Sequence, residues 1–240
     1  MVTATFHFHD ELNDFLPPAR RQQAFATPCA RAATAKHMIE ALGVPHTEVG
    51  LVQINGTAAG LDQMLQEGDQ VSLFPGNPPP PSPVLFVADA HLGGLARLLR
   101  MAGFDTLYDN AFHDAEIAAI SAQQHRIVLT RDRDLLIRKE IVHGCYVRAL
   151  KAEPQAQQVL ARYRLAQQAR PFTLCLYCNA PLHPVAKSEV EAALPPQVRA
   201  LQQTFRRCDV CARVYWKGSH WQRMDNLLRR ILDDPAPGSV

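Results

Sequence analysis

Four cysteines in the last third of the chain have the spacing of a metal site. They form two C-x-x-C pairs, Cys175 with Cys178 and Cys208 with Cys211. Two thiolate pairs complete a tetrahedral Zn²⁺ shell that leaves no position open for a substrate. Redox motifs and disulfides are the alternatives, and residues 179–207 form a longer insert than the usual ~15–20 residues. We interpret the four cysteines as a structural zinc site.

Carboxylates occur where a second kind of metal site could form. Asp89 follows one apolar run that is typical of a buried strand, and Asp132 and Asp134 follow another. Asp114 opens a predicted helix. In α/β sheets, active residues gather beyond the carboxyl ends of the strands. Carboxylate oxygens suit Mg²⁺ or Mn²⁺, which can activate a water and stabilise charge on a phosphodiester, so the pattern predicts a hydrolytic metal site.

Most of these carboxylates also have an ordinary structural explanation. Asp114 could be a helix N-cap, Asp134 could cap the helix that follows it, and Asp109 suits a turn. Asp89, directly after a buried strand, is harder to explain by structure alone. Glu116 and Asp109 are second choices for the metal site.

Aromatic and basic side chains alternate after the second cysteine pair, where residues 212–221 read ARVYWKGSHW. Such interleaving suits stacking on bases and contact with phosphates. The aromatic rings could instead pack the cysteine region against the rest of the protein, so Lys217 and His220 are the better candidates for substrate contact. The other candidates are Arg97 and Arg100, three residues apart on a predicted helix, and Arg131, which lies among the acids.

A proline-rich segment divides the chain. Residues 75–83 read PGNPPPPSP, a composition that favours an extended polyproline spacer over a helix or a central strand. We predict a linker here and place the other boundaries by the patterns around it. The predicted parts are residues 1–75, a linker at 76–83, residues 84–168, residues 169–232 and a disordered tail at 233–240.

The first part has the pattern of a small α+β domain. Residues 4–8 alternate like a strand, and residues 30–42 read as a helix that ends before Gly43. Residues 49–56 are a predicted strand that ends in an Asn-Gly hairpin signal, and residues 70–74 are another. The predicted order is therefore β, α, β, β.

The second part alternates between strand and helix patterns, which predicts an α/β domain with a mostly parallel sheet. Predicted strands are 84–88, 106–108, 126–130 and 145–149. Predicted helices are 92–102, 114–124, 135–139 and 156–168. In the last part we expect a short helix near 189–194 and an amphipathic packing helix at 223–232.

The bulk composition fits a globular protein. The chain has 240 residues, of which 47% are hydrophobic and 20% charged, and its net charge is +2. This net charge does not by itself indicate a nucleic-acid binder, so evidence for nucleic-acid binding must come from local clusters of charge. No apolar run approaches the roughly 20 residues that span a bilayer, and the start lacks a signal-peptide pattern, so we expect a cytoplasmic location.

The acidic and cysteine motifs resemble a known nuclease family. The stretches FVADAHLGGLARLLRMAGFDTLYDN, DAEIAAISAQQHRIVLTRDRDLL and YWKGSHW, with the cysteine pairs, resemble PIN-like ribonuclease domains and, more narrowly, the Mut-seven C-terminal RNase family. The resemblance covers about residues 84–225. It implies a nuclease in which the metal-site acids are Asp89, Asp114, Asp132 and Asp134.

The first part resembles a second fold. The stretch VGLVQINGTAAGLDQMLQEGDQVSLFP is similar to the second half of a ubiquitin-like β-grasp domain, as in the small sulfur carriers of thiamin and molybdopterin synthesis. Those carriers act through a free C-terminal Gly-Gly. This chain instead has Pro75-Gly76 there and continues, so the resemblance favours a binding or scaffold role over sulfur transfer.

The residues and the resemblance together predict a metal-dependent ribonuclease. We expect a ubiquitin-like β-grasp domain, a PIN-like α/β domain and a C-terminal zinc ribbon, with structural Zn²⁺ and catalytic Mg²⁺ or Mn²⁺. RNA is the expected partner, and the β-grasp domain could bind a protein. The alternative is a non-catalytic zinc-ribbon adaptor that binds RNA in a salt-sensitive way, with the β-grasp domain for protein interaction.

Overall fold

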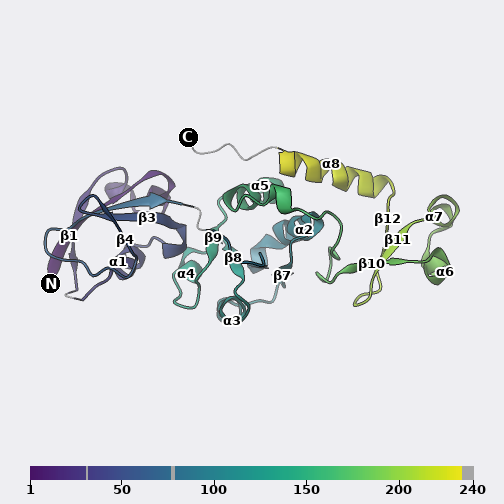
Figure 1. The fold of residues 1–240 in the computed structure, drawn as a ribbon, viewed down its shortest axis with the longest axis horizontal. Helices are drawn as coiled ribbons and strands as arrows, with labels where there is room; N and C mark the ends of the chain where they lie inside the picture. The colour runs from purple at the N-terminus through teal and green to yellow at the C-terminus, as the bar shows by residue number, and fades with distance from the viewer. Residues whose placement is uncertain (31, 77–78, 234–240) are drawn as a thin grey trace. The chain divides into compact units, whose positions relative to one another are not determined.

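The computed structural model describes residues 1–30, 32–76 and 79–233 (Figure 1). Residues 77 and 78 of the predicted linker and residues 234–240 of the predicted tail lie outside this description. The chain divides into two compact units, Met1–Pro81 with His113–Tyr146, and Ser82–Phe112 with Val147–Val240. Within the described ranges, the helices are too short or too polar to traverse a bilayer.

The first unit begins with a five-stranded sheet in the order β2-β1-β5-β3-β4. The elements of this fold are β1 (Val2–Phe8), β2 (Phe25–Cys29), α1 (Ala35–Ala41), β3 (Val49–Ile54), β4 (Thr57–Ala59) and β5 (Gln70–Pro75). Strands β1 and β5 are parallel, and the other pairs are antiparallel. Phe6, Phe8 and Leu73 form a buried core with Met38 and Ile39 of α1. This arrangement confirms the predicted β-grasp fold.

The β-grasp fold differs from the sequence prediction at β2, at β4 and at the start of α1; β4 completes the hairpin with β3 but was not predicted as a strand. Strand β2 was not predicted; it contains Pro28, which its position at the edge of the sheet tolerates. Helix α1 begins at Ala35 rather than residue 30, because the Thr34 hydroxyl accepts a hydrogen bond from His37 N at 3.2 Å and caps the helix there. The predicted hairpin turn is confirmed, with positive φ at Asn55 and Gly56.

The remaining part of the first unit supplies two parallel strands. Its elements are α3 (Asp114–Gln124), β8 (Ile127–Thr130), α4 (Arg133–Leu136) and β9 (Gly144–Tyr146). Strands β8 and β9 pair in parallel, and every residue of β8 is buried. Helix α4 begins two residues before the predicted helix, because the Asp132 side chain accepts a hydrogen bond from Asp134 N.

The β-grasp fold is joined to β9 by buried contacts within the first unit. The turn η3 (His46–Glu48) places Glu48 at 2% exposure, and its Oε1 accepts a hydrogen bond from Tyr146 N at 2.9 Å. The ring of Tyr146 meets Phe15 edge to face at 5.0 Å between centroids. The proline-rich boundary gave no indication of this contact, which makes the β-grasp fold part of the first unit's core.

Replacing Glu48 by Ala should lower the free energy of unfolding by about 1–3 kcal/mol, because the partly buried Tyr146 N–H would lose its acceptor, the buried Glu48 carboxylate. Urea unfolding followed by circular dichroism measures this. The control is Glu67→Ala, since Glu67 accepts a comparable hydrogen bond from Thr3 N at an exposed position. A Glu48 variant no less stable than the Glu67 variant would contradict the buried link.

The second unit contains the other parallel pair and its covering helices. Its first elements are β6 (Phe86–Ala88), the turn η4 (Ala90–Leu92), α2 (Gly93–Ala102), β7 (Thr106–Tyr108) and α5 (Ala152–Arg162). Strands β6 and β7 are parallel, which together with β8 and β9 confirms the mostly parallel α/β prediction. Leu95 and Leu99 of α2 are fully buried, and Gly103 ends α2 with φ of 91°.

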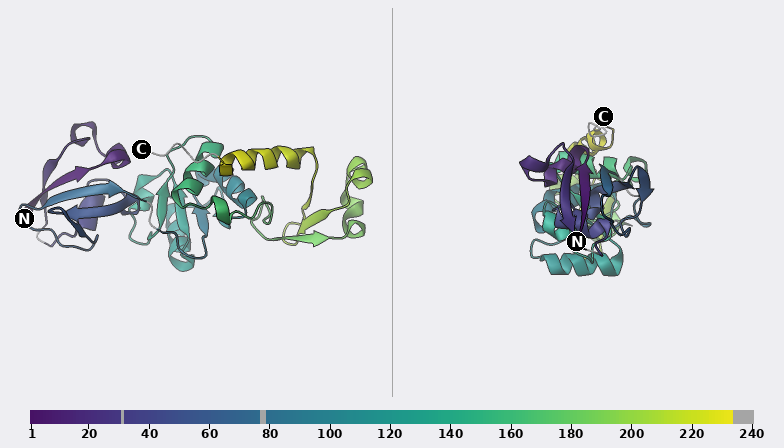
Figure 2. Two further views of the ribbon diagram at one scale, coloured as in Figure 1. Left: turned by 45° about the horizontal axis from the view of Figure 1, so that its top comes forward. Right: turned by 90° about the vertical axis from the view of Figure 1, so that its left-hand side faces the viewer.

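The C-terminal part of the second unit is a small antiparallel ribbon with three helices. Its elements are β10 (Leu182–Val185), α6 (Lys187–Val190), α7 (Pro196–Leu201), β11 (Phe205–Cys208), β12 (Val214–Trp216) and α8 (Ser219–Asp233). Helix α8 returns from the ribbon to α5, where Arg230 pairs with Glu153 at 3.3 Å (Figures 1 and 2). Leu228 and Ile231 are buried, which confirms the predicted packing helix.

Candidate functional site

The four cysteines converge on one point in the ribbon. Their Sγ atoms all lie within 4.8 Å of one another, with Cys175 to Cys211 at 3.6 Å and Cys178 to Cys208 at 3.3 Å. Sulfurs around a tetrahedral zinc lie about 3.8 Å apart when Zn–S is about 2.3 Å. The cysteines are not in disulfides, and their spacing fits a metal that they share. The predicted clustering is confirmed, and the site could hold zinc.

Two similar turns bring the sulfurs together. Each C-x-x-C pair is followed by a residue in the left-handed region, Asn179 with φ of 67° and Ala212 with φ of 58°. Cys175 N donates to Ala180 O at 2.7 Å, and Cys208 N donates to Arg213 O at 3.0 Å. These hydrogen bonds close each turn so that both sulfurs of a pair face the other pair.

Polar neighbours favour the thiolate form of Cys175 and Cys211, whereas burial raises the pKa of the Cys178 thiol to about 12. Burial raises the pKa of the Cys211 thiol, but hydrogen bonds from the backbone and guanidinium of Arg213 outweigh it and bring that pKa to about 6. The Tyr215 hydroxyl lies 3.2 Å from Cys175 Sγ and can donate to it. Over the residues that the structure describes, this is the one group of three or more potential ligands with its donor atoms so close.

Arg100 was predicted to contact substrate, and this prediction is wrong. Its side chain is 5% exposed, and Nε donates to Thr106 O at 2.9 Å while Nη1 donates to Tyr177 O at 2.8 Å. Burial lowers the pKa of the Arg100 guanidinium. The three-residue spacing from Arg97 gave no sign that one of the two faces the interior. Arg100 instead ties α2 and β7 to the first cysteine turn.

Replacing Arg100 by Met should destabilise the protein by about 1–3 kcal/mol, because buried carbonyls would lose their donor and a charge-assisted hydrogen bond would be lost. Thermal denaturation followed by circular dichroism measures the effect. The matched control is Arg97→Met, an exposed position one turn earlier on α2, which should change stability by less than about 0.5 kcal/mol. Equal stability of the two variants would show that the buried hydrogen bonds contribute little.

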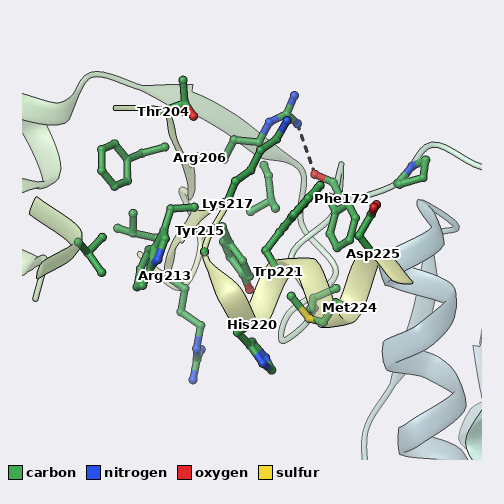
Figure 3. Close-up of a pocket in the computed structure, with 18 of the residues that line it drawn as sticks. Phe172, Thr204, Arg206, Arg213, Tyr215, Lys217, His220, Trp221, Met224 and Asp225 are labelled. Carbon is green, nitrogen blue, oxygen red and sulfur yellow. Dashed lines mark hydrogen bonds between the residues drawn. The ribbon is translucent and has the colours of Figure 1, made fainter. Parts of the chain in front are cut away.

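An open groove of about 1200 Å³ lies on the ribbon beside the start of α8 (Figure 3). We call it the ribbon groove. Its aromatic lining residues are Phe172, Phe205, Tyr177, Tyr215, Trp216 and Trp221. Its basic lining residues are Arg97, Arg206, Arg213, Lys217 and His220. Of the predicted substrate-contact residues, the structure therefore brings Arg97, Lys217 and His220 to one groove.

Rings and cations meet closely inside the ribbon groove. Phe172 and Trp221 have ring centroids 5.1 Å apart, and Lys217 Nζ lies 5.2 Å from the centre of the Trp221 ring (Figure 3). Arg213 lies over the Tyr177 ring at 3.7 Å. Phe172 was not predicted to belong here, because it precedes the first cysteine pair in the sequence and meets Trp221 only through the fold.

Asp89 lies in the second unit, directly after β6. It is half-buried, and its Oδ1 accepts a hydrogen bond from Ala90 N at 2.6 Å as the cap of η4. The Tyr108 hydroxyl donates to Ala90 O at 3.0 Å and so supports the same turn. The predicted position of Asp89 at the carboxyl end of a buried strand is confirmed.

The other three aspartates lie in the first unit. Asp132 and Asp134 follow β8 and are exposed, and Arg133 Nε lies 3.0 Å from Asp134 Oδ1. The cap of α4 is Asp132, so Asp134 does not cap a helix. Asp114 is the first residue of α3, and His113 occupies the cap position, so the N-cap explanation of Asp114 is also excluded. Arg131 is exposed next to Asp132.

Asp109 and Glu116, the second choices for the metal site, are less well suited to bind a metal. Asp109 Oδ1 accepts a hydrogen bond from Ala111 N at 2.9 Å, which is the turn role that the sequence favoured. Glu116 is exposed in the first turn of α3. Binding of a metal by these acids stays a prediction.

Two family models match successive parts of this chain. A family model described as Mut7-C RNAse domain matches residues 84–228, and one described as Mut7-C ubiquitin matches residues 1–79. Among solved structures, the small archaeal modifier protein 1 of H. volcanii is 20% identical with a TM-score of 0.26, covering 31% of this chain and 98% of that chain. A putative molybdopterin converting factor subunit 1 from Pyrococcus furiosus is 17% identical with a TM-score of 0.25, and the match covers the same shares.

Among curated proteins no match was found. The match to the RNAse model covers more than half of the chain and includes all four aspartates and all four cysteines. The chain belongs to the Mut7-C RNAse domain family, and a Mut7-C ubiquitin domain precedes the RNAse domain.

Proposed function

We propose that this protein is a metal-dependent ribonuclease that hydrolyses RNA phosphodiester bonds. Asp89, Asp114, Asp132 and Asp134 would hold Mg²⁺ or Mn²⁺. The observation that carries the proposal is the match to the RNAse domain over residues 84–228, which contain all four acids. Their carboxylate oxygens are the hard donors that these ions prefer.

The positions of the acids support the proposal. Asp89 directly follows β6, and Asp132 and Asp134 follow β8, at the carboxyl ends of buried strands. The carboxyl ends of strands are where active residues of α/β proteins gather. When bound there, the ion would supply Lewis-acid activation of water and charge neutralisation at the phosphate.

The chain's own residues would orient the acids and hold the RNA. Backbone N–H groups fix one oxygen each of Asp89 and Asp132, which limits how these carboxylates can turn. Arg133 restrains Asp134. We propose that the exposed Arg131 contacts a phosphate, and that Arg97, Lys217 and His220 contribute to RNA binding.

Cleavage assays test the proposed function. A labelled single-stranded RNA is incubated with the protein and Mg²⁺, Mn²⁺ or EDTA, and the products are resolved by gel electrophoresis. We expect products that depend on the added ion and disappear with EDTA. Absence of products with either ion, over a panel of single-stranded and structured RNAs, would contradict the proposal.

The ribbon groove also favours a second candidate, a non-catalytic RNA-binding adaptor. Its basic and aromatic lining could hold RNA without cutting it. This candidate predicts salt-sensitive binding with no metal-dependent turnover. We also propose that the β-grasp domain contributes a protein-interaction surface, which a pull-down with the full chain would test.

A further inference from the structure

We infer that the ribbon groove is a binding site for single-stranded RNA, held by base stacking on Trp221 and by phosphate contacts to Lys217 and Arg206. The inference rests on the proposed function in one respect: it names the class of RNA that the nuclease would receive. The groove belongs to one unit and is built from the cysteine turns, β11, β12 and the start of α8 (Figure 3).

The charge of the ribbon groove fits a polyanion. Four Arg and Lys side chains line it, and the one carboxylate among the lining residues is Asp225. Asp225 is neutralised by Arg229 at 2.9 Å. Although the chain as a whole has a net charge of only +2, this surface concentrates positive charge where a phosphate backbone could lie.

The aromatic content of the groove favours unpaired bases. Rings in a groove can stack on a base only when that base is not already stacked within a duplex. Trp221 has Phe172 beside it and Lys217 near its ring, so stacking and a cation are available at the same point. Base stacking on an aromatic side chain contributes about 1–3 kcal/mol per base and tolerates any sequence.

The size of the groove also fits a polymer. Its 1200 Å³ exceeds the roughly 300–1,000 Å³ of small-molecule pockets. The exposed side chains of His220 and Lys217 line the groove together with Trp221. An extended strand of several nucleotides would fill this volume better than a single small ligand.

The two tryptophans of the chain, Trp216 and Trp221, both line the ribbon groove. Intrinsic tryptophan fluorescence therefore reports on this site alone. The full-length protein, with its zinc and without added Mg²⁺ or Mn²⁺, is titrated with a 12-nucleotide oligo(U), a blunt RNA duplex and a poly-glutamate peptide. We expect saturable quenching by oligo(U) and weaker quenching by the other two.

Variants test which residues carry the binding. Fluorescence anisotropy of labelled oligo(U) should show about 5- to 150-fold weaker binding for Trp221→Ala, the equivalent of losing one stacked base. Lys217→Ala should weaken binding and reduce the salt dependence by about one phosphate contact. The control Lys139→Ala removes an exposed lysine outside the groove and should bind like the wild type.

Several results would overturn the inference. They are equal binding by Trp221→Ala and Lys217→Ala, equal or tighter binding of the duplex, or tighter binding of the acidic peptide. Because Lys217 is exposed, its variant remains informative if Trp221→Ala misfolds. If the protein cleaves RNA and its groove variants bind RNA normally, the groove is not the RNA-binding site, and the proposed nuclease function is unaffected. If binding depends on the groove but no RNA is cleaved with any added ion, the groove is supported and the proposed nuclease function is contradicted.

Discussion

Replacing Asp132 by Asn should lower the rate of metal-dependent RNA cleavage at least about 100-fold, because one carboxylate ligand of the proposed ion is lost. Metal ions contribute several kcal/mol of transition-state stabilisation, and each 1.4 kcal/mol corresponds to a factor of ten. The substitution is well suited to the question. Asp132 Oδ1 caps α4 by accepting from Asp134 N at 2.8 Å, and an Asn side chain retains that acceptor.

Asp89→Asn provides a parallel test in the second unit. Its Oδ1 caps η4, and the amide of Asn again offers an oxygen at that position. A loss of activity in both variants would therefore reflect the missing charge rather than a frayed helix or turn. Single-turnover cleavage of a labelled RNA with Mg²⁺ is the measurement.

The matched control is Asp62→Asn, an exposed acid of the β-grasp domain that should leave cleavage unchanged. Circular dichroism and thermal denaturation confirm that each variant is folded. Wild-type rates in Asp89→Asn and Asp132→Asn would eliminate the aspartate site and leave the adaptor as the better explanation.

Removing zinc should unfold the ribbon while the β-grasp domain remains folded. Structural zinc supplies folding free energy directly, since the site does not exist in the unfolded chain. The ribbon has little else to hold it, because its own buried clusters are small and one of them consists of Cys175, Leu182 and Cys208. The β-grasp core, with Phe6, Phe8 and Leu73, contains no metal ligand from this site.

Cys208→Ser tests the same point without a chelator. We expect one zinc per chain in the wild type by mass spectrometry under native conditions, and loss of that zinc in the variant. Trp216 and Trp221 should become more solvent-exposed, with a red shift of their emission, and oligo(U) binding should fall. The control is Cys29→Ala, a buried cysteine of the β-grasp domain that should retain its zinc. An unchanged emission spectrum in zinc-free protein would contradict this role of the metal.

Together these experiments separate two roles for metals. A zinc held by the four cysteine sulfurs would have no open position, so its expected role is to stabilise the surface that would bind RNA. Cleavage would depend on a different ion with oxygen ligands. EDTA can remove the metal from both sites. The variants Asp132→Asn and Cys208→Ser distinguish the two sites because each variant changes a residue of only one of them.

Local signals in the sequence were sufficient for much of the fold. The Asn-Gly hairpin at residues 55–56, the helix stop at Gly103 and the bounds of β7 and α3 agree with the structure. These features depend on turn chemistry and on apolar periodicity, which act over a few residues. The C-x-x-C spacing identified the cysteine cluster for the same reason, since two ligands of each pair come from one turn.

Errors arose where distant residues control a local choice. Pro28 lies in a strand because β2 is at the sheet edge, a property of the assembled sheet rather than of residues 25–29. Arg100 is interior because Thr106 and Tyr177 offer it carbonyls, and Tyr177 is far along the chain.

The clustering of the four cysteines and the positions of the acids after buried strands could thus be predicted from the amino-acid order, because spacing and strand ends determine them. The ribbon groove could not, because it requires Phe172, Arg97 and Trp221 to meet from three separated segments. The link from Glu48 to Tyr146 likewise exists only after folding. Long-range contacts of this kind are set by the packing of whole elements, and no short stretch of sequence encodes them.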